Sequence, residues 1–202
     1  MMTSLPNLLT LSRILAVPLL VGLLYVRGPA ASWAACVIFA AACITDYLDG
    51  WIARRSGQVS PFGRFLDPIA DKLLIAAVIL MLVASDRVAG LAVLPALVIL
   101  CREILVSGLR EYLAQIQVPM PVSKLAKWKT TIQMVALAVL IVGDAGPAVL
   151  PVQLIGEVGL WAAAALTFVT GYDYLQRGVK HMLADDAEDD RAARGSERRA
   201  GG

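Results

Sequence analysis

Long apolar segments alternate with short polar ones along the whole chain. Several are shorter than the roughly 20 residues that a helix needs to cross a bilayer. They reach that length only by including neighbouring polar residues, which must then face a bundle interior or a watery cavity. The pattern predicts an all-α integral membrane protein with six transmembrane helices, built around apolar runs at residues 14–26, 29–45, 73–84, 88–101, 132–143 and 158–172.

Composition supports the membrane class. Of the 202 residues, 58% are hydrophobic and 17% are charged, and the mean hydropathy is +0.71. A soluble domain of this length does not need so much apolar surface. We therefore expect one domain over residues 1–183. Residues 184–202 are charged and lack an apolar face, which predicts a disordered cytoplasmic tail.

The basic residues are distributed unevenly between the two sides of such a bundle. With six spans, the outer loops would contain only Arg27 and Arg87, and the other sixteen of the eighteen Lys and Arg residues would lie toward the opposite side. Because positive charge favours the cytoplasmic side, we expect both termini in the cytoplasm.

Four aspartates lie between the second and third apolar runs. In each of the two segments the polar and small positions follow the i, i+3, i+4, i+7 spacing of one helical face, or a close variant of it. A short turn would bring the two faces together as a cluster of four carboxylates. The two sets are Asp46, Asp49, Gly50 and Ala53, and Ser60, Gly63, Asp67 and Asp71.

Four carboxylates near lipid are very costly unless their charge is compensated. Mg²⁺ and Mn²⁺ take oxygen ligands and commonly bind together with a substrate phosphate, and no nearby His or Cys favours zinc. Gly50 and Ala53 indicate that something bulky lies flat against the helix. The pattern therefore predicts a polar, metal-binding cavity at the cytoplasmic side.

The stretch from Asp46 to Asp71 reads D-x2-D-G-x2-A-R-x8-G-x3-D-x3-D. It resembles, position for position, the signature of the CDP-alcohol phosphatidyltransferase family, and PNLLTLSR at residues 6–13 is similar to that family's entry segment. The resemblance implies a six-helix membrane enzyme, usually a homodimer, that transfers a phosphatidyl group from a CDP-linked lipid to an alcohol and releases CMP. It implies two divalent cations, Mg²⁺ or Mn²⁺, on Asp46, Asp49, Asp67 and Asp71, with Asp71 also accepting a proton. It assigns binding of the CDP moiety to Asn7, Thr10, Gly50, Ala53, Arg54 and Ser60.

A second polar constellation bears on the acceptor alcohol. Five basic residues at the predicted cytoplasmic level fit a pocket for an anionic acceptor, and we select Arg110, Lys124 and Lys129 to bind its phosphate. The segments REILVSGLRE and KWKTTIQM resemble the phosphatidylglycerolphosphate synthase branch of the family, with a departure at Ala126, where that branch usually has Gly. This resemblance implies CDP-diacylglycerol as donor and sn-glycerol 3-phosphate as acceptor, in the inner membrane of a bacterium. It implies membrane lipids, and no nucleic acid, as further partners.

Other interpretations stay open at this point. Within the family, the acceptor would alternatively be inositol phosphate, serine or phosphatidylglycerol. Intramembrane prenyltransferases also bind a diphosphate through aspartates, but in two separated motifs rather than one continuous signature. A divalent-cation transporter would place its aspartates in mid-span, with a path to both sides, whereas these aspartates gather at one end.

Overall fold

The computed structural model describes residues 5–26, 28–56, 61–116, 124–172 and 176. Within these ranges, the side chains of residues 5–6, 49–56, 61–62, 64, 115 and 124 lie outside what is described. The described part of the chain is helical, as the apolar pattern predicts. The predicted domain boundary after residue 183 and the predicted tail lie outside the described residues.

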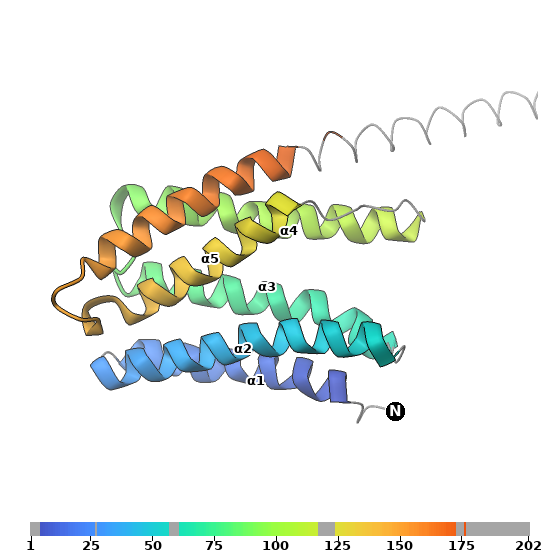
Figure 1. Cartoon of the computed structure of the whole chain (residues 1–202), viewed down its shortest axis with the longest axis horizontal. Coiled ribbons are helices and arrows are strands. Elements are labelled where there is room, and N and C mark those ends of the chain that lie inside the picture. Colours follow the sequence, from blue (N-terminus) through green and yellow to red (C-terminus); the bar gives the residue numbers. More distant parts are fainter. Residues whose placement is uncertain (1–4, 27, 57–60, 117–123, 173–175, 177–202) are drawn as a thin grey trace, which may run out of the picture.

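The helices lie side by side as a bundle, and successive long helices run in opposite directions (Figure 1). We call the end at which α1 begins the near end and the end at which α1 finishes the far end. Helices α2 and α4 end toward the near end, and α3 and α5 begin there (Figure 1). The elements are α1 (Leu5–Val26), α2 (Pro29–Ser56), α3 (Pro61–Ala84), η1 (Gly90–Ala92), α4 (Val93–Gln115), α5 (Lys124–Val142), η2 (Gly143–Ala145) and a last helix over Val152–Tyr172.

Among the described residues, five helical stretches are long and apolar enough to cross a membrane. Helix α3 is not among them, although its 24 residues would span a bilayer by length. Its first half contains Asp67, Asp71 and Lys72, so its apolar part is short. The five stretches are Asn7–Val26, Pro29–Leu48, Gly90–Ala114, Leu125–Ala145 and Val152–Tyr172.

The outer surface of the bundle is apolar. Leu15, Leu80 and Phe168 each expose about two thirds of their surface, and many other large hydrophobic side chains are exposed as well. Such a surface is unfavourable in water and suits contact with lipid. The buried core is formed by side chains from all the long helices, including Leu20, Phe39, Leu82, Ile99, Leu140 and Leu160.

Small residues allow the last helix to approach α5 closely. A Cβ added at Gly156 would lie 2.6 Å from the Leu140 side chain, and one added at Gly159 would lie 2.9 Å from the Cβ of Ala136. Backbones that approach this closely gain packing contacts along their whole length, which is the usual role of small residues in membrane helices. Elsewhere, α1 packs against α2 and α3, α2 against α5, and α3 against α4.

Candidate active site

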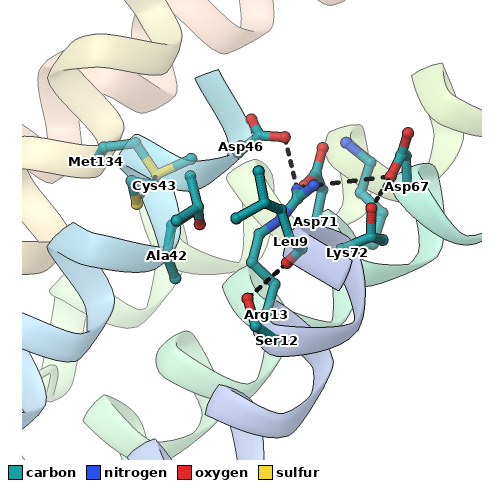
Figure 2. A network of polar contacts seen from close by, with 12 residues as sticks. Leu9, Ser12, Arg13, Ala42, Cys43, Asp46, Asp67, Asp71, Lys72 and Met134 are labelled. Carbon is teal, nitrogen blue, oxygen red and sulfur yellow. Dashed lines mark hydrogen bonds and ion pairs between the residues drawn. The ribbon is translucent and has the colours of Figure 1, made fainter. Parts of the chain in front are cut away.

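Three of the four predicted aspartates converge on a single arginine at the near-end half of the bundle (Figure 2). Asp46 of α2 and Asp71 of α3 both accept from the same guanidinium nitrogen of Arg13, with Asp46 at 2.6 Å. Asp67 of α3 lies 3.7 Å from the other terminal nitrogen. The Arg13 side chain is 1% exposed, whereas the three carboxylates stay 39–45% exposed. We call Arg13 and these three aspartates the carboxylate cluster.

Helix α1 supplies a polar face to this cluster. Asn7, Thr10 and Arg13 are spaced by three residues and are all buried, so they lie along one side of the helix. The Thr10 hydroxyl donates to Asp67 at 2.5 Å. Thr10 therefore fixes the orientation of one aspartate directly, and Asn7 lies one turn closer to the near end.

The cluster has the chemistry of a site for a hard divalent cation. One guanidinium and three carboxylates give the cluster a formal charge of −2. Every negatively charged group that could bind a cation there is a carboxylate, and hard divalent cations prefer oxygen ligands. Among the described side chains, no three of His, Cys, Asp and Glu gather closely enough to hold a metal ion without rearrangement, because Arg13 lies between the aspartates. The fourth predicted ligand, Asp49, lies in α2 with its side chain outside the described residues.

The predicted CDP contacts are described only in part. Asn7 and Thr10 lie beside the carboxylate cluster on α1. Gly50, Ala53 and Arg54 lie in α2 beyond Asp46, but their side-chain surroundings are outside the described residues. Ser60 lies entirely outside them. These assignments stay predictions.

A second charged group surrounds Glu103 of α4. The Lys72 ammonium lies 2.6 Å from Glu103 Oε2, and the Lys129 ammonium contacts Oε1. Arg102 lies 3.6 Å from Oε1 and also donates to the hydroxyl of Thr170 at 3.3 Å. Three helices thus meet at one carboxylate, and Arg102 connects them to the last helix. We call Lys72, Arg102, Glu103 and Lys129 the Glu103 cluster.

The three residues predicted to bind the acceptor phosphate have different surroundings, as far as the structure describes them. Lys129 is 1% exposed and pairs with Glu103, whereas Arg110 lies on an exposed position of α4. Arg110 is nevertheless close enough to repel the Lys72 ammonium, as Arg102 also does. Lys124 is the first residue of α5, and its side chain lies outside the described residues.

Sequence reasoning gave no site role to Arg13 or Lys72, although both form ion pairs in these groups. A signal for Arg13 was present: it is the only charged residue in α1, and a lone charge in an apolar helix needs a partner. Lys72 follows Asp71 directly, so the carboxylate cluster and the Glu103 cluster are adjacent along α3.

Comparison with known proteins agrees with this geometry. Residues 3–169 match the family CDP-alcohol phosphatidyltransferase. A CDP-diacylglycerol--glycerol-3-phosphate 3-phosphatidyltransferase of Rickettsia bellii is 47% identical over 89% of this chain and 97% of its own length. The protein of the same name from Cereibacter sphaeroides is 38% identical with the same coverage. A cardiolipin synthase (CMP-forming) of Oryza sativa is 42% identical over 68% of this chain and 45% of its own length. The resemblance seen in the sequence is confirmed: the chain belongs to the CDP-alcohol phosphatidyltransferase family.

Proposed function

We propose that this protein transfers the phosphatidyl group of CDP-diacylglycerol to sn-glycerol 3-phosphate, giving phosphatidylglycerol phosphate and CMP. The observation that carries the proposal is the adjacency of two opposite charge clusters, joined at Asp71 and Lys72. An acidic cluster suits cations that neutralise a diphosphate, and a basic cluster suits an anionic acceptor. Bacterial relatives that bear this activity in their names match the chain over 86% or more of its length.

Asp46, Asp49, Asp67 and Asp71 would hold two divalent cations, Mg²⁺ or Mn²⁺. Dependence on divalent cations is general in the family. When bound, such cations neutralise the charge of the diphosphate and of the departing CMP phosphate. The formal charge of −2 on the described part of the carboxylate cluster supports this assignment.

The reaction needs one proton acceptor. The 1-hydroxyl oxygen of glycerol 3-phosphate bonds to the phosphorus that carries diacylglycerol, the bond from that phosphorus to the CMP oxygen breaks, and the hydroxyl loses its proton. Asp71 is the aspartate nearest in sequence to the basic cluster, so its carboxylate is best placed to take that proton. Thr10 would keep Asp67 oriented through its hydrogen bond.

The two substrates would bind on opposite sides of Asp71. We assign the CDP moiety to Asn7, Thr10, Gly50, Ala53, Arg54 and Ser60. The burial of Asn7 and Thr10 beside Asp67 supports the first two. We assign the acceptor phosphate to Arg110, Lys124 and Lys129, and the closeness of Arg110 to Lys72 supports a common basic pocket.

We further propose that α3 is the sixth membrane span, with its polar first half facing the bundle interior. Contacts of Asp67 and Asp71 with Thr10 and Arg13 of α1 support this orientation. An even number of spans puts both termini on one side, which we assign to the cytoplasm of a bacterium, with the protein in its inner membrane as a homodimer. Residues 1–183 would form the enzyme domain and residues 184–202 a tail.

Cysteine labelling tests the orientation. Cysteines introduced at Ser85 and Ala145, in a background lacking Cys36, Cys43 and Cys101, should react with an impermeant reagent outside intact cells. Cysteines at Ser56 and Gln115 should not react. Labelling at Ser56 from outside would reverse the assignment.

Phosphatidylglycerol is the second candidate acceptor, because the match to a cardiolipin synthase favours it. Its phosphodiester has one negative charge, however, whereas glycerol 3-phosphate has a dianionic phosphate. The Glu103 cluster has three cations and one anion, and its formal charge of +2 suits the dianion better.

The test is an acceptor panel. Purified protein in lipid–detergent micelles is incubated with CDP-diacylglycerol, Mg²⁺ and one acceptor at a time: glycerol 3-phosphate, inositol phosphate, serine, glycerol or phosphatidylglycerol. CMP release should be fastest with glycerol 3-phosphate and very slow with glycerol. Faster release with any other acceptor would refute the acceptor assignment while leaving the family assignment in place.

A further inference from the structure

Glu103 connects three helices through ion pairs, and one of its partners reaches a fourth helix. One carboxylate oxygen meets Lys72 of α3 at 2.6 Å, and the other meets Lys129 of α5 and, at 3.6 Å, Arg102 of its own helix. Arg102 extends the group to Thr170 of the last helix. Both carboxylate oxygens are therefore used, and each holds at least one cation in place.

Burying this group of charges inside a membrane protein costs free energy of desolvation. The Glu103 side chain is 11% exposed and that of Lys129 is 2% exposed, so both charges have lost most of their water. A buried ion pair of this kind is commonly no more stable than apolar residues of the same size. A cluster with an excess of positive charge is less favourable still. A contribution to folding stability therefore does not explain why three cations surround one anion. Binding of an anionic ligand does explain it.

We propose that Glu103 is a positioning residue that arranges Lys72, Arg102 and Lys129 into a binding site for a doubly charged phosphate. The carboxylate cancels one of three positive charges and holds the rest at fixed points, which leaves a formal charge of +2. The proposal rests on the proposed function, because it takes the phosphate to be that of glycerol 3-phosphate. It adds a residue that does not itself touch the substrate.

The position of Lys72 supports the proposal. Because Lys72 follows Asp71 in α3, holding its ammonium on Glu103 also sets where the basic cluster lies relative to the carboxylate that accepts the proton. A small acceptor must present its phosphate to one cluster and its hydroxyl to the other at the same time. Loss of Glu103 would therefore weaken binding of glycerol 3-phosphate and leave binding of CDP-diacylglycerol unchanged.

Two buried polar atoms near Lys129 also support a polar ligand here. Gln133, one turn beyond Lys129 on α5, is 1% exposed, and no described group bonds its Oε1. The packing of Gly156 on Leu140 and of Gly159 on Ala136 sets an antiparallel register that brings Thr167 to the level of Lys129. Thr167 is fully buried, and its Oγ1 likewise has no hydrogen-bond partner among the described residues. Buried polar atoms are seldom left unpaired, so a polar ligand or water is expected beside them.

The test compares Glu103→Gln with Glu157→Gln, a control that makes the same change on the last helix toward the far end. Glu157 accepts from Gln153 and has no contact with either cluster in the described structure. In Glu103→Gln the apparent KM for glycerol 3-phosphate should rise on the order of tenfold or more, because a buried ammonium loses its partner. The KM for CDP-diacylglycerol should stay within about twofold of the parent value, and Glu157→Gln should leave both constants unchanged. Glu103→Asp, which keeps the charge, should recover part of the loss.

Binding without turnover separates positioning from a merely structural role. In EDTA, glycerol 3-phosphate and inorganic phosphate should raise the Tm of the parent protein and of Glu157→Gln, but raise that of Glu103→Gln much less. A KM for glycerol 3-phosphate that is unchanged, or lower, would overturn the proposal, since a lower value would mean that Glu103 competes with the phosphate for the same cations. Equal rises in both KM values would also overturn it. If Glu103→Gln does not fold, Glu103→Asp is measured by the same criteria.

The proposed function is checked separately in the same experiment. The parent protein is first assayed with the full acceptor panel. If the parent prefers an acceptor without a phosphate dianion, the proposed function fails. If the parent prefers glycerol 3-phosphate and the Glu103 variants retain its KM, only the positioning role fails.

Discussion

Each end of the bundle contains an arginine that connects neighbouring helices, but the two arginines have different partners. Arg13, in the near-end half, contacts three carboxylates. Arg87, at the far end, donates to the backbone carbonyl of Ile141 and to the Ser32 hydroxyl, the latter at 2.7 Å. Its own carbonyl accepts from the Gln153 amide at 2.5 Å.

The difference shows which feature marks a functional site in this molecule. Arg87 pairs with neutral acceptors and satisfies a carbonyl in the last turn of α5, which a helix end otherwise leaves open. The Arg87 guanidinium keeps its own positive charge at these contacts. Arg13 and its three carboxylates instead have a formal charge of −2. An excess of carboxylates next to lipid, rather than a buried arginine as such, therefore indicates the site.

The largest effect should follow from removing a carboxylate of the near-end cluster. Asp67→Asn should abolish CMP release, because a neutral ligand leaves the diphosphate charge uncompensated, and EDTA should do the same reversibly. Asp67 is the aspartate farthest from Arg13, so this change disturbs the remaining ion pairs least. Asp144→Asn, an exposed far-end carboxylate in η2, is the control and should keep parent activity. Near-normal release from Asp67→Asn at saturating Mg²⁺ would contradict the metal assignment.

Asp71→Asn should separate two roles of one residue. Loss of a general base typically lowers the rate by about 10²–10⁴-fold. If Asp71 accepts the proton, the variant should lose turnover while retaining much of its affinity for CDP-diacylglycerol, measured by binding of a fluorescent CDP-lipid. A parallel loss of binding and turnover would leave the proton-acceptor role unsupported.

Removing one cation of the acceptor pocket should have an intermediate effect. Arg110→Ala or Lys129→Ala should raise the KM for glycerol 3-phosphate by on the order of tenfold or more, since a charged hydrogen bond contributes about 1.5–3 kcal/mol. The KM for CDP-diacylglycerol should barely change. Initial rates over a matrix of both substrates measure the two constants together, and a rise in both would show that the pocket is not specific for the acceptor.

The smallest effect on catalysis should come from the far-end arginine. Arg87→Ala removes hydrogen bonds to Ile141 and Ser32 and should lower the Tm, while both KM values stay near those of the parent. Arg13→Ala is the matched change in the other half of the bundle and should alter the Mg²⁺ concentration needed for half-maximal activity. If Arg87→Ala and Arg13→Ala changed the Mg²⁺ dependence equally, the assignment of the metal site to the Arg13 end of the bundle would be contradicted.

The sequence predicts the parts of this site that depend on spacing within one helix. Asp46 lies on α2, and Asp67 and Asp71 lie together on α3, as the i, i+3, i+4 pattern indicates. In the described part of the chain each apolar run overlaps a long helix, but only five of these helices have the composition of a membrane span, because the first half of α3 is charged.

The parts that the sequence does not predict depend on which helices lie opposite each other. Arg13 meets Asp46 and Asp71 from 33 and 58 residues away, and Lys129 meets Glu103 from 26. A helical period describes one helix and carries no information about its neighbours. The same limit applies to Lys129, which is predicted to bind the acceptor phosphate and which the structure pairs with Glu103.

The position of Arg13 also has a consequence for how the protein is made. Arg13 is synthesised 33 residues before Asp46 and 58 residues before Asp71. An arginine at the centre of a membrane helix costs about 2.5–3.5 kcal/mol on insertion scales, and less near a helix end, where the side chain can reach the headgroups. We therefore expect the first helix to enter the bilayer before the carboxylates that pair with Arg13 are in place. We expect it to reach its final depth only when the second and third helices insert, so that the first three helices would insert as one unit.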